Sequence, residues 1–460
     1  MSDAANEDVK FSLKVMVNKD KTKVLFAEAD PHFVDILLSF LTLPLGRIIE
    51  FFDNHYKGEE TPSIGSLTNF SRSLDNLADA HFVTEDAQQA LLYVNSSFED
   101  AYKCLKLDIS NSQSAKYFCC FLTSHGSIPC VSIYYDNLTC KVCGNTMRKE
   151  AAERPSIAAS SDGVFVKSKA SFTISGDLQI FPNEIGLLSF ITLLGITDAH
   201  EAQEIQVSFG FNEIMDLLKA SLTSPTPLSD LILRKKTKSS TAAISMHEIV
   251  NEINPRCRNL SLKLMIRKST GELLYAQAQE DFVEFLSGLL TIPLGGLEHL
   301  QAGKSCFKAI NNLYRSTAEL DDKYFKTSET KKRLMNPHLP HGCISPNQIL
   351  PLTEECLPAE YIDDLSLFSS VAFPEGQGRY LERPTTYLVS DNLTVTPYFT
   401  ASALCRMNKE KIPISDVEEM QLQIGLKEAL SILKASLTST TTALSDALLN
   451  AYPSHKRQKK

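Results

Sequence analysis

The chain has 460 residues, of which 43% are hydrophobic and 22% are charged, values typical of folded globular proteins. Its length allows two or three domains with cores of their own. The net charge of −9 argues against nucleic-acid or anionic-membrane binding over the whole surface. The N-terminus is polar and acidic, and the longest apolar stretches, at 36–46 and 185–196, are too short to span a bilayer. We therefore expect a soluble intracellular protein, cytoplasmic or nuclear, with no membrane partner and with cysteines that are thiols or metal ligands.

A segment of 34 residues occurs twice in the chain. Leu13–Gly46 aligns without a gap on Leu262–Gly295, with 15 identical positions. Self-similarity at such a long period indicates repeated folding units. Residues that differ between the copies are therefore not needed to build the fold.

Each copy begins with the pattern of a β-hairpin followed by a helix. In the first copy, 11–17 and 23–29 are β-rich runs on either side of a polar turn. Asp30 and Pro31 are typical of a helix start, with Asp as the cap and Pro at the first helical position. Apolar residues then recur at helical spacing from Phe33 to Leu41. Pro44 and its counterpart Pro293 end this helix or begin the next one.

Further matches follow in both halves. Asn69, Arg72 and Ser73 correspond to Asn312, Arg315 and Ser316 on stretches with a helical pattern. Downstream, 174–182 matches 389–397, and the Lys-Ala-Ser-Leu-Thr-Ser segment at 219–224 is identical to that at 434–439. The downstream block predicts a strand, a polar connection and an amphipathic helix.

We expect an α+β fold of two tandem repeated units, each a β-hairpin packed on helices plus a further strand–helix block. The predicted first unit spans 11–233, with a Cys-rich insertion at about 117–148, and the second spans 260–449. A polar linker at 234–259 joins them, and 450–460 is a basic tail. The Pro-rich stretch 336–358 is expected to form a long surface loop.

Taken together, the hairpin–helix ending in Thr-x-Pro-Leu-Gly, the Asn-x-x-x-Ser stretch and the Lys-Ala-Ser-Leu-Thr-Ser helix resemble the plant family called domain of unknown function 674. The resemblance runs from about Phe11 to Leu449. It implies a soluble plant protein, and it carries over no activity, substrate or catalytic residue.

The best candidate for a chemical site is the segment Cys140-Lys141-Val142-Cys143-Gly144. A Cys-x-x-Cys-Gly turn can direct two thiolates at one metal ion, with Gly allowing the tight knuckle. Zinc needs two more ligands, and the candidates upstream are Cys130 with Cys120 or Cys119, or His125 as a substitute. The cluster, with Met147 shortly after its last Cys, also resembles the cysteine cluster in the first unit of that family.

The repeat offers a partial test of the metal hypothesis. If 136–139 is aligned on 391–394, Val395 and Tyr398 stand where the first unit has Cys140 and Cys143. The cysteines are then not needed for folding and require a separate explanation. Structural zinc, plain thiols and a redox dithiol remain open, although no thioredoxin-like pattern surrounds the pair.

Other motifs are weaker. The segment 302–305 imitates the end of a phosphate-binding loop, but Glu298 replaces the first glycine of that motif. His338, His341 and Cys343 lie in the Pro-rich stretch, where a plain loop is the simpler interpretation. The sequence has neither a nucleophile elbow nor a dinucleotide fingerprint.

The function is therefore left open by the sequence. We expect a non-enzymatic interaction or scaffold protein with a structural zinc knuckle and a protein partner. One alternative is an enzyme with an unrecognised site between the units. The other is a zinc-dependent nucleic-acid binder, which needs Lys141, Arg148 and Lys149 on one face, and which the acidic charge and the absence of Trp do not favour.

Overall fold

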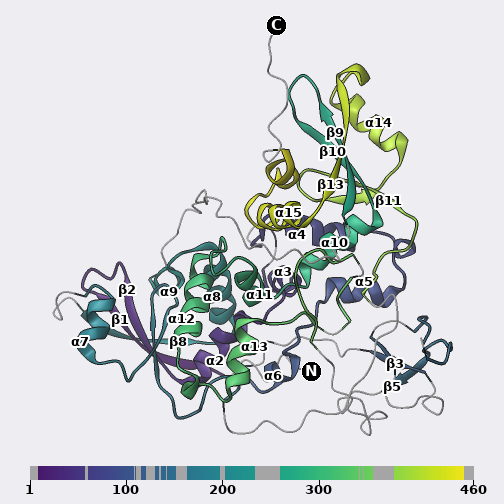
Figure 1. Ribbon diagram of the computed structural model, residues 1–460. Coiled ribbons are helices and arrows are strands. Elements are labelled where there is room, and N and C mark those ends of the chain that lie inside the picture. The colour runs from purple at the N-terminus through teal and green to yellow at the C-terminus, as the bar shows by residue number, and fades with distance from the viewer. Residues whose placement is uncertain are drawn as a thin grey trace.

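The computed structural model describes residues 9–56, 58, 61–107, 109, 116–120, 130–133, 136–140, 142–151, 163–196, 202–233, 259–340, 342–345, 347–355 and 378–449. Within these ranges the chain forms helices and three antiparallel sheets, which confirms the mixed α+β class (Figure 1). None of the helices in these ranges is long and apolar enough to cross a membrane. The predicted linker, apart from residue 259, and the basic tail lie outside the described residues.

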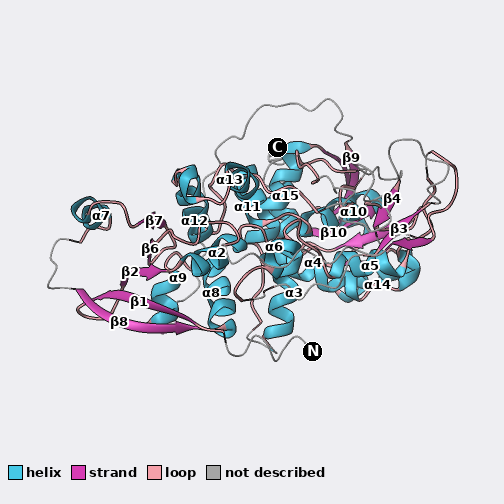
Figure 2. Ribbon diagram, turned by 90° about the horizontal axis from the view of Figure 1, so that it is seen from below, coloured by secondary structure: helices cyan, strands magenta, loops and turns pink. Residues whose placement is uncertain are grey.

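The two larger sheets share one strand order. The first runs β7-β6-β2-β1-β8 and the second runs β12-β11-β10-β9-β13. The matching strands are β1 (Phe11–Asn18) and β9 (Leu260–Arg267), β2 (Val24–Ala29) and β10 (Leu273–Gln279), β6 (Phe172–Ser175) and β11 (Thr386–Val389), β7 (Ile180–Pro182) and β12 (Val395–Pro397), and β8 (Ala202–Phe209) and β13 (Val417–Ile424). The sheets lie at opposite ends of the molecule, with helices between them (Figure 2).

The predicted hairpin and helix are present in the first sheet. Side chains of β1 alternate between buried and more exposed positions, as expected for a strand with one face on the core. Helix α2 (Pro31–Phe40) starts at Asp30, whose carboxylate accepts a hydrogen bond of 2.8 Å from the Phe33 N–H. Pro44 caps the next helix, α3 (Leu45–His55). The second copy repeats this with α10 (Glu280–Leu290) and α11 (Leu294–Leu300).

The downstream block begins with a hairpin and not with the single strand that was predicted there. This segment contains the turn and second strand of a hairpin, β6-β7, and the matching segment contains those of β11-β12. Leu178 and Leu393 sit in the turns with φ of 66° and 64°. The polar connection was also wrong, because it includes the edge strands β8 and β13. Apolar residues alternate with polar ones in both strands, at Ile205, Val207 and Phe209 of β8 and at Met420, Leu422 and Ile424 of β13, and this alternation was the available signal for a strand.

The helices after these edge strands begin in the same way in both copies. They are α8 (Phe211–Thr223) and α15 (Leu426–Thr438). The N–H of Gly210 donates to the Glu213 carboxylate at 2.9 Å, and that of Gly425 donates to Glu428 at 3.0 Å. The repeated Gly and Glu are therefore explained by helix capping.

The two Thr-x-Pro-Leu-Gly corners contact each other. Pro44 and Pro293 form an antiparallel bridge, and the flanking backbone groups exchange hydrogen bonds of 2.9 and 3.0 Å. A Cβ atom added at Gly295 would lie 2.9 Å from the Leu41 carbonyl oxygen, so the close approach requires glycine there. The repeated corner joins one copy to the other.

In each half of the chain, one helix packs against the sheet-and-helix block of the other half. The two helices are α4 (Gly65–Asp75) and α12 (Lys308–Glu319). Helix α4 packs against α15 of the second copy, and α12 packs against α8 of the first. The Ser73 hydroxyl accepts a hydrogen bond from the Val395 N–H at 3.1 Å, and the matching Ser316 accepts one from Ile180 at 3.0 Å. The two halves are therefore interlocked.

A third, smaller sheet carries the cysteine-rich segment. Its strand order is β4-β3-β5. The strands are β3 (Tyr117–Cys119), β4 (Val131–Ile133) and β5 (Lys149–Ala151). One large hydrophobic core runs through both halves, whereas Phe118, Met147 and three buried cysteines form a separate small core. This segment is thus a satellite of the main fold.

The Pro-rich stretch differs from its prediction as a surface loop. In its described part, which extends to residue 355, it is irregular except for short bridges, but Leu339, Ile349 and Leu350 are at most 3% exposed. The Asn347 side chain donates a hydrogen bond of 2.8 Å to the buried carboxylate of Glu284. The stretch packs inward because its apolar and amide side chains have partners in the core.

Candidate metal centre

The first cysteines of the candidate site lie at the end of strand β3. Cys119 is the last residue of the strand, opposite Val131 of β4 and Lys149 of β5, and Cys120 follows directly. Successive side chains of a strand point to opposite faces. The main chain therefore directs only one of these two thiols toward the small core, and that thiol is Cys120.

The Cys-x-x-Cys-Gly segment forms the predicted tight turn. The Cys140 N–H donates to the Asn145 carbonyl and the Gly144 N–H donates to the Cys140 carbonyl, both at 2.9 Å. Gly144 has φ of +71°, a conformation that side chains disfavour. The Val142 N–H points at the Cys140 sulfur, with a nitrogen–sulfur distance of 3.4 Å. A knuckle of this kind turns both of its sulfur atoms to one side.

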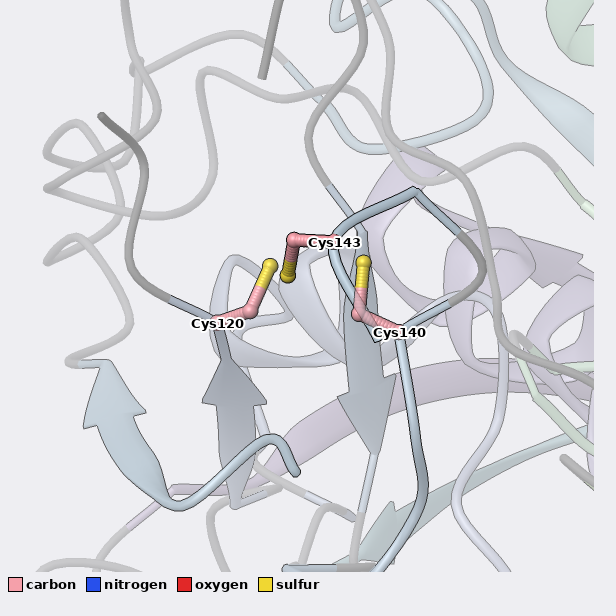
Figure 3. A group of neighbouring side chains, drawn as sticks. All are labelled: Cys120, Cys140 and Cys143. Atoms are coloured by element: carbon pink, nitrogen blue, oxygen red, sulfur yellow. The ribbon is translucent and has the colours of Figure 1, made fainter. Parts of the chain in front are cut away.

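Three thiols converge at this turn. The Sγ atoms of Cys120, Cys140 and Cys143 all lie within 4.8 Å of one another. Figure 3 shows the three side chains pointing toward a common centre, one from the end of β3 and two from the knuckle. Cys120 and Cys140 are 2% and 1% exposed, and Cys143 is partly buried.

The other predicted ligands are placed differently. Cys130 is 2% exposed and lies in the same small core, but it is not part of the group of three. Cys119 is fully buried and also stands outside that group. His125 and Lys141 lie outside the described residues. Three of the five predicted cysteines are thus brought together.

The electrostatics of the thiols differ within the group. Burial raises the pKa of Cys120, and its hydrogen bond to Cys140 raises it further. Burial alone would also raise the pKa of Cys140, but the N–H groups of Cys143 and Val142 donate to its sulfur and the net effect is a lowered pKa. The Cys140 sulfur is therefore the one prepared to carry negative charge.

This arrangement has the chemistry of a thiolate metal site. In a tetrahedral zinc site with Zn–S bonds of about 2.3 Å, neighbouring sulfurs lie about 3.8 Å apart. The separations of at most 4.8 Å in this group are close to that value. Three thiolates and one more ligand would close the coordination sphere, which excludes a substrate.

The comparison of 136–139 with 391–394 was wrong. Residues 391–394 follow β11 and lead into β12, and their counterpart in the first sheet is the turn at 176–179 between β6 and β7. Residues 136–139 instead lead into the knuckle, where Thr139 bridges to Thr146. Among the described residues, the small sheet of the cysteine segment occurs once.

Neither of the weaker motifs forms a ligand site in the described residues. The segment 302–305 follows α11 and not a strand, and Ser305 donates to the buried carboxylate of Glu298. In the second motif, His341 lies outside the described residues, and the Cys343 N–H donates to Glu354 at 2.6 Å. Both segments serve the packing of the core.

A pair of buried carboxylates was not predicted from the sequence. Asp35 and Glu284 stand at matching positions of the repeat and are 1% and 0% exposed. Asp35 accepts three backbone hydrogen bonds of 2.7 to 2.9 Å from residues 164–166. Glu284 accepts one of 3.0 Å from Arg383. An acidic residue that recurs on an otherwise apolar helix face was the signal available in the sequence. In the structure, both carboxylates hold loop segments against the core.

The fold and site define an α+β protein with two like sheets and one cysteine-rich satellite. Residues 7–426 match the family described as "Protein of unknown function (DUF674)". Because the match covers more than half of the chain, the protein belongs to this family. Comparison with curated proteins and with solved structures found no match.

Proposed function

We propose that this protein is a soluble, non-catalytic scaffold of two tandem units, stabilised in the first unit by a structural zinc ion. The observation that carries the proposal is the convergence of the Cys120, Cys140 and Cys143 sulfurs. They supply three of the four ligands of a closed tetrahedral site. We assign the fourth position to Cys130, which is buried in the same small core.

The need for a metal follows from the size of this segment. Its sheet consists of strands of three residues each, and its separate core contains few apolar side chains. A core of this size contributes little stability, and small elements of this kind commonly depend on a metal or a disulfide. Zinc binding would supply the missing free energy of folding.

Metal analysis of the purified protein tests the proposal. We expect one zinc ion per chain, lost when Cys140 and Cys143 are both replaced by Ser. Cys405→Ser, which changes an exposed thiol of the second half, is the matched control and should retain the metal. Cys130→Ser should lose zinc and Cys119→Ser should keep it. A wild-type protein without metal, prepared under reducing conditions with zinc supplied, would refute the site.

A scaffold needs surfaces for protein partners, and matching helices of the two halves offer them. The helices are α7 (Leu187–Leu193) and α14 (Thr400–Lys409), which follow β7 and β12. Leu188 and Leu193 of α7 are 76% and 62% exposed, and Phe399 and Leu404 at α14 are 62% and 46% exposed. Exposed apolar side chains grouped on one element are typical of protein-binding surfaces.

Cross-linking in a cell extract, followed by mass spectrometry, tests this part of the proposal. Partner peptides should be linked to α7 or α14. Replacing Leu188, which does not line the pocket between the halves, with Asp should remove the links at α7 and leave the unfolding temperature unchanged. Links that persist in this variant would contradict the assignment of α7 as a partner surface.

The two alternatives receive less support. Arg148 and Lys149 are exposed beside the knuckle, but Glu150 is exposed next to them and reduces the positive charge that nucleic-acid binding requires. A pocket between the halves has three cations and one carboxylate in its lining. Such a set suits binding of an anion better than acid–base catalysis.

A further inference from the structure

A pocket of about 560 Å³ lies between the two interlocked halves. One wall is the β6-β7 turn of the first sheet, and the opposite wall is helix α12, which the second half contributes. Leu193, Leu194 and Pro225 give the pocket an apolar side. Its volume is within the range of sites that bind small molecules.

The charges in the pocket are mainly positive. Lys23, Lys308 and Arg315 line it, and none of them forms an ion pair with a carboxylate in the part of the chain that the structure describes. The carboxylate of Asp177 is already engaged, because it accepts hydrogen bonds from Gln179 at 3.0 Å and from Asn312 at 3.1 Å. The pocket thus offers three cationic groups to a ligand.

The second copy shows that the fold does not need these cations. The position of Lys23 on the first hairpin corresponds to Glu272 on the second. The position of Lys308 at the start of α12 corresponds to Gly65 at the start of α4. Two positive charges of the first sheet are therefore replaced by one negative charge at the equivalent place in the second.

The third cation, Arg315, also differs from its counterpart in the second sheet. Its counterpart Arg72 is held in an ion pair of 2.6 Å with Asp53, so its charge is neutralised within the protein. With Asp177 included, the charged residues that line the pocket sum to +2, whereas the equivalent positions together with Asp53 sum to −1. A shared fold does not require this difference. The extra positive charge at the pocket is therefore available to bind an anionic ligand.

The packing of the exchanged helix also differs between the copies. In the second sheet, Ser66 donates a hydrogen bond of 2.6 Å to the Ser439 carbonyl, and this bond ties α4 to the loop after α15. Ala309 replaces Ser66 on α12 and cannot form the corresponding bond. At that junction of the first sheet, Pro225 lines the pocket.

We propose that this pocket binds a small organic anion. Its phosphate or carboxylate group contacts Lys23, Lys308 and Arg315, and its apolar body lies against Leu193 and Leu194. Guanidinium and ammonium groups are the usual partners of phosphate and carboxylate, and the planar Arg fork can bind either in a bidentate manner. A ligand in this position contacts both halves of the chain.

Isothermal titration calorimetry of the full chain tests the proposal. The probes are phenyl phosphate, phenylacetate and benzyl alcohol, which combine an aromatic ring with a phosphate, a carboxylate or a neutral group. We expect at least one of the two anions to bind at least tenfold more tightly than benzyl alcohol. Whichever anion binds more tightly identifies the headgroup.

The second copy supplies the variants. Lys23→Glu with Lys308→Gly introduces residues that the equivalent positions already carry, and it should weaken anion binding at least tenfold. Lys169→Glu changes an exposed lysine that does not line the pocket and should have no effect. Anions that bind no better than benzyl alcohol, or equal affinities in wild type and the double variant, would overturn the proposal. Retained binding in Cys140→Ser with Cys143→Ser separates this site from the zinc site.

Discussion

The carboxyl group of Glu298 is buried in the core, and we expect its ionisation to destabilise the folded protein. The side chain is 0% exposed on helix α11. Burial raises the pKa of Glu298 to about 7, although hydrogen bonds from Ser305 and the charge of Arg315 act in the opposite direction. The second oxygen of this carboxyl has only a long contact of 3.5 Å to the Ser305 N–H. The charged form is therefore poorly compensated.

The magnitude follows from the linkage between protonation and folding. Well below pH 4.5 the carboxyl is protonated in both the folded and the unfolded chain, so it has no effect on stability. As the pH rises, the unfolded chain ionises first, and the free energy of unfolding falls until the folded carboxyl ionises near pH 7. The loss amounts to about 1 kcal/mol at pH 5 and about 3 kcal/mol at pH 8.

Glu298→Gln removes the ionisation and keeps the size of the side chain. We expect the variant to gain about 2 kcal/mol more stability over wild type at pH 8 than at pH 5. Urea unfolding at both pH values measures this difference. Glu354, whose pKa burial also raises to about 7, contributes equally to both proteins and cancels. Glu319→Gln, at an exposed position on α12, is the control and should show no pH-dependent gain.

Two results would refute this reasoning. An equal stability difference at pH 5 and pH 8 would show that Glu298 ionises at its ordinary pKa in the folded protein. A variant that loses stability relative to wild type as the pH rises would show that the charged carboxylate is favourable in its folded environment. Either outcome would mean that burial does not dominate the environment of this group.

Two further predictions concern the packing. Gly65→Ala should cost about 3 kcal/mol, because its Cβ would lie 2.3 Å from the Ser436 oxygen and φ is +48°. Gly271→Ala has a similar φ of +75° with no atom within 4 Å, so urea unfolding should show a loss of only about 1 kcal/mol. Arg383→Met should cost about 3 kcal/mol or more in the same assay, since it leaves Glu284 buried without its cation. Glu284→Gln in that background should recover part of the loss, and no recovery would contradict the ion-pair explanation.

Local signals in the sequence predict the first half of each copy. The β1 alternation, the Asp30-Pro31 helix start and the apolar face of α2 each determine structure within a few residues of themselves, so they can be recognised without knowledge of the fold. The knuckle is local in the same way, because its turn depends on Cys140, Gly144 and the residues between them. These parts were therefore predicted correctly.

The parts that were missed depend on contacts between distant segments. Edge strand β8 pairs with β1 along its whole length, and the alternation of Ile205, Val207 and Phe209 could have predicted a strand here but not its distant partner. The match of Ser73 with Ser316 in the sequence shows that helices α4 and α12 are equivalent. It does not show that each helix contacts the sheet of the other half. Residues 391–394 were matched correctly with 176–179, within the match of 174–182 on 389–397, but they were also matched with 136–139, because those four residues are identical in sequence.

The exchange of α4 and α12 explains how the two copies can differ at the pocket. When a helix of one copy covers the sheet of the other, two equivalent junctions form, and the shared hydrogen bonds at Ser73 and Ser316 already hold both. Sequence change at the margin of one junction then leaves the other intact. Ala309 and Lys308 stand at such a margin, where a lost hydrogen bond to the loop is accompanied by an added positive charge. An anion bound there would replace the lost tie between helix and loop, so ligand binding and the union of the two halves should stabilise each other.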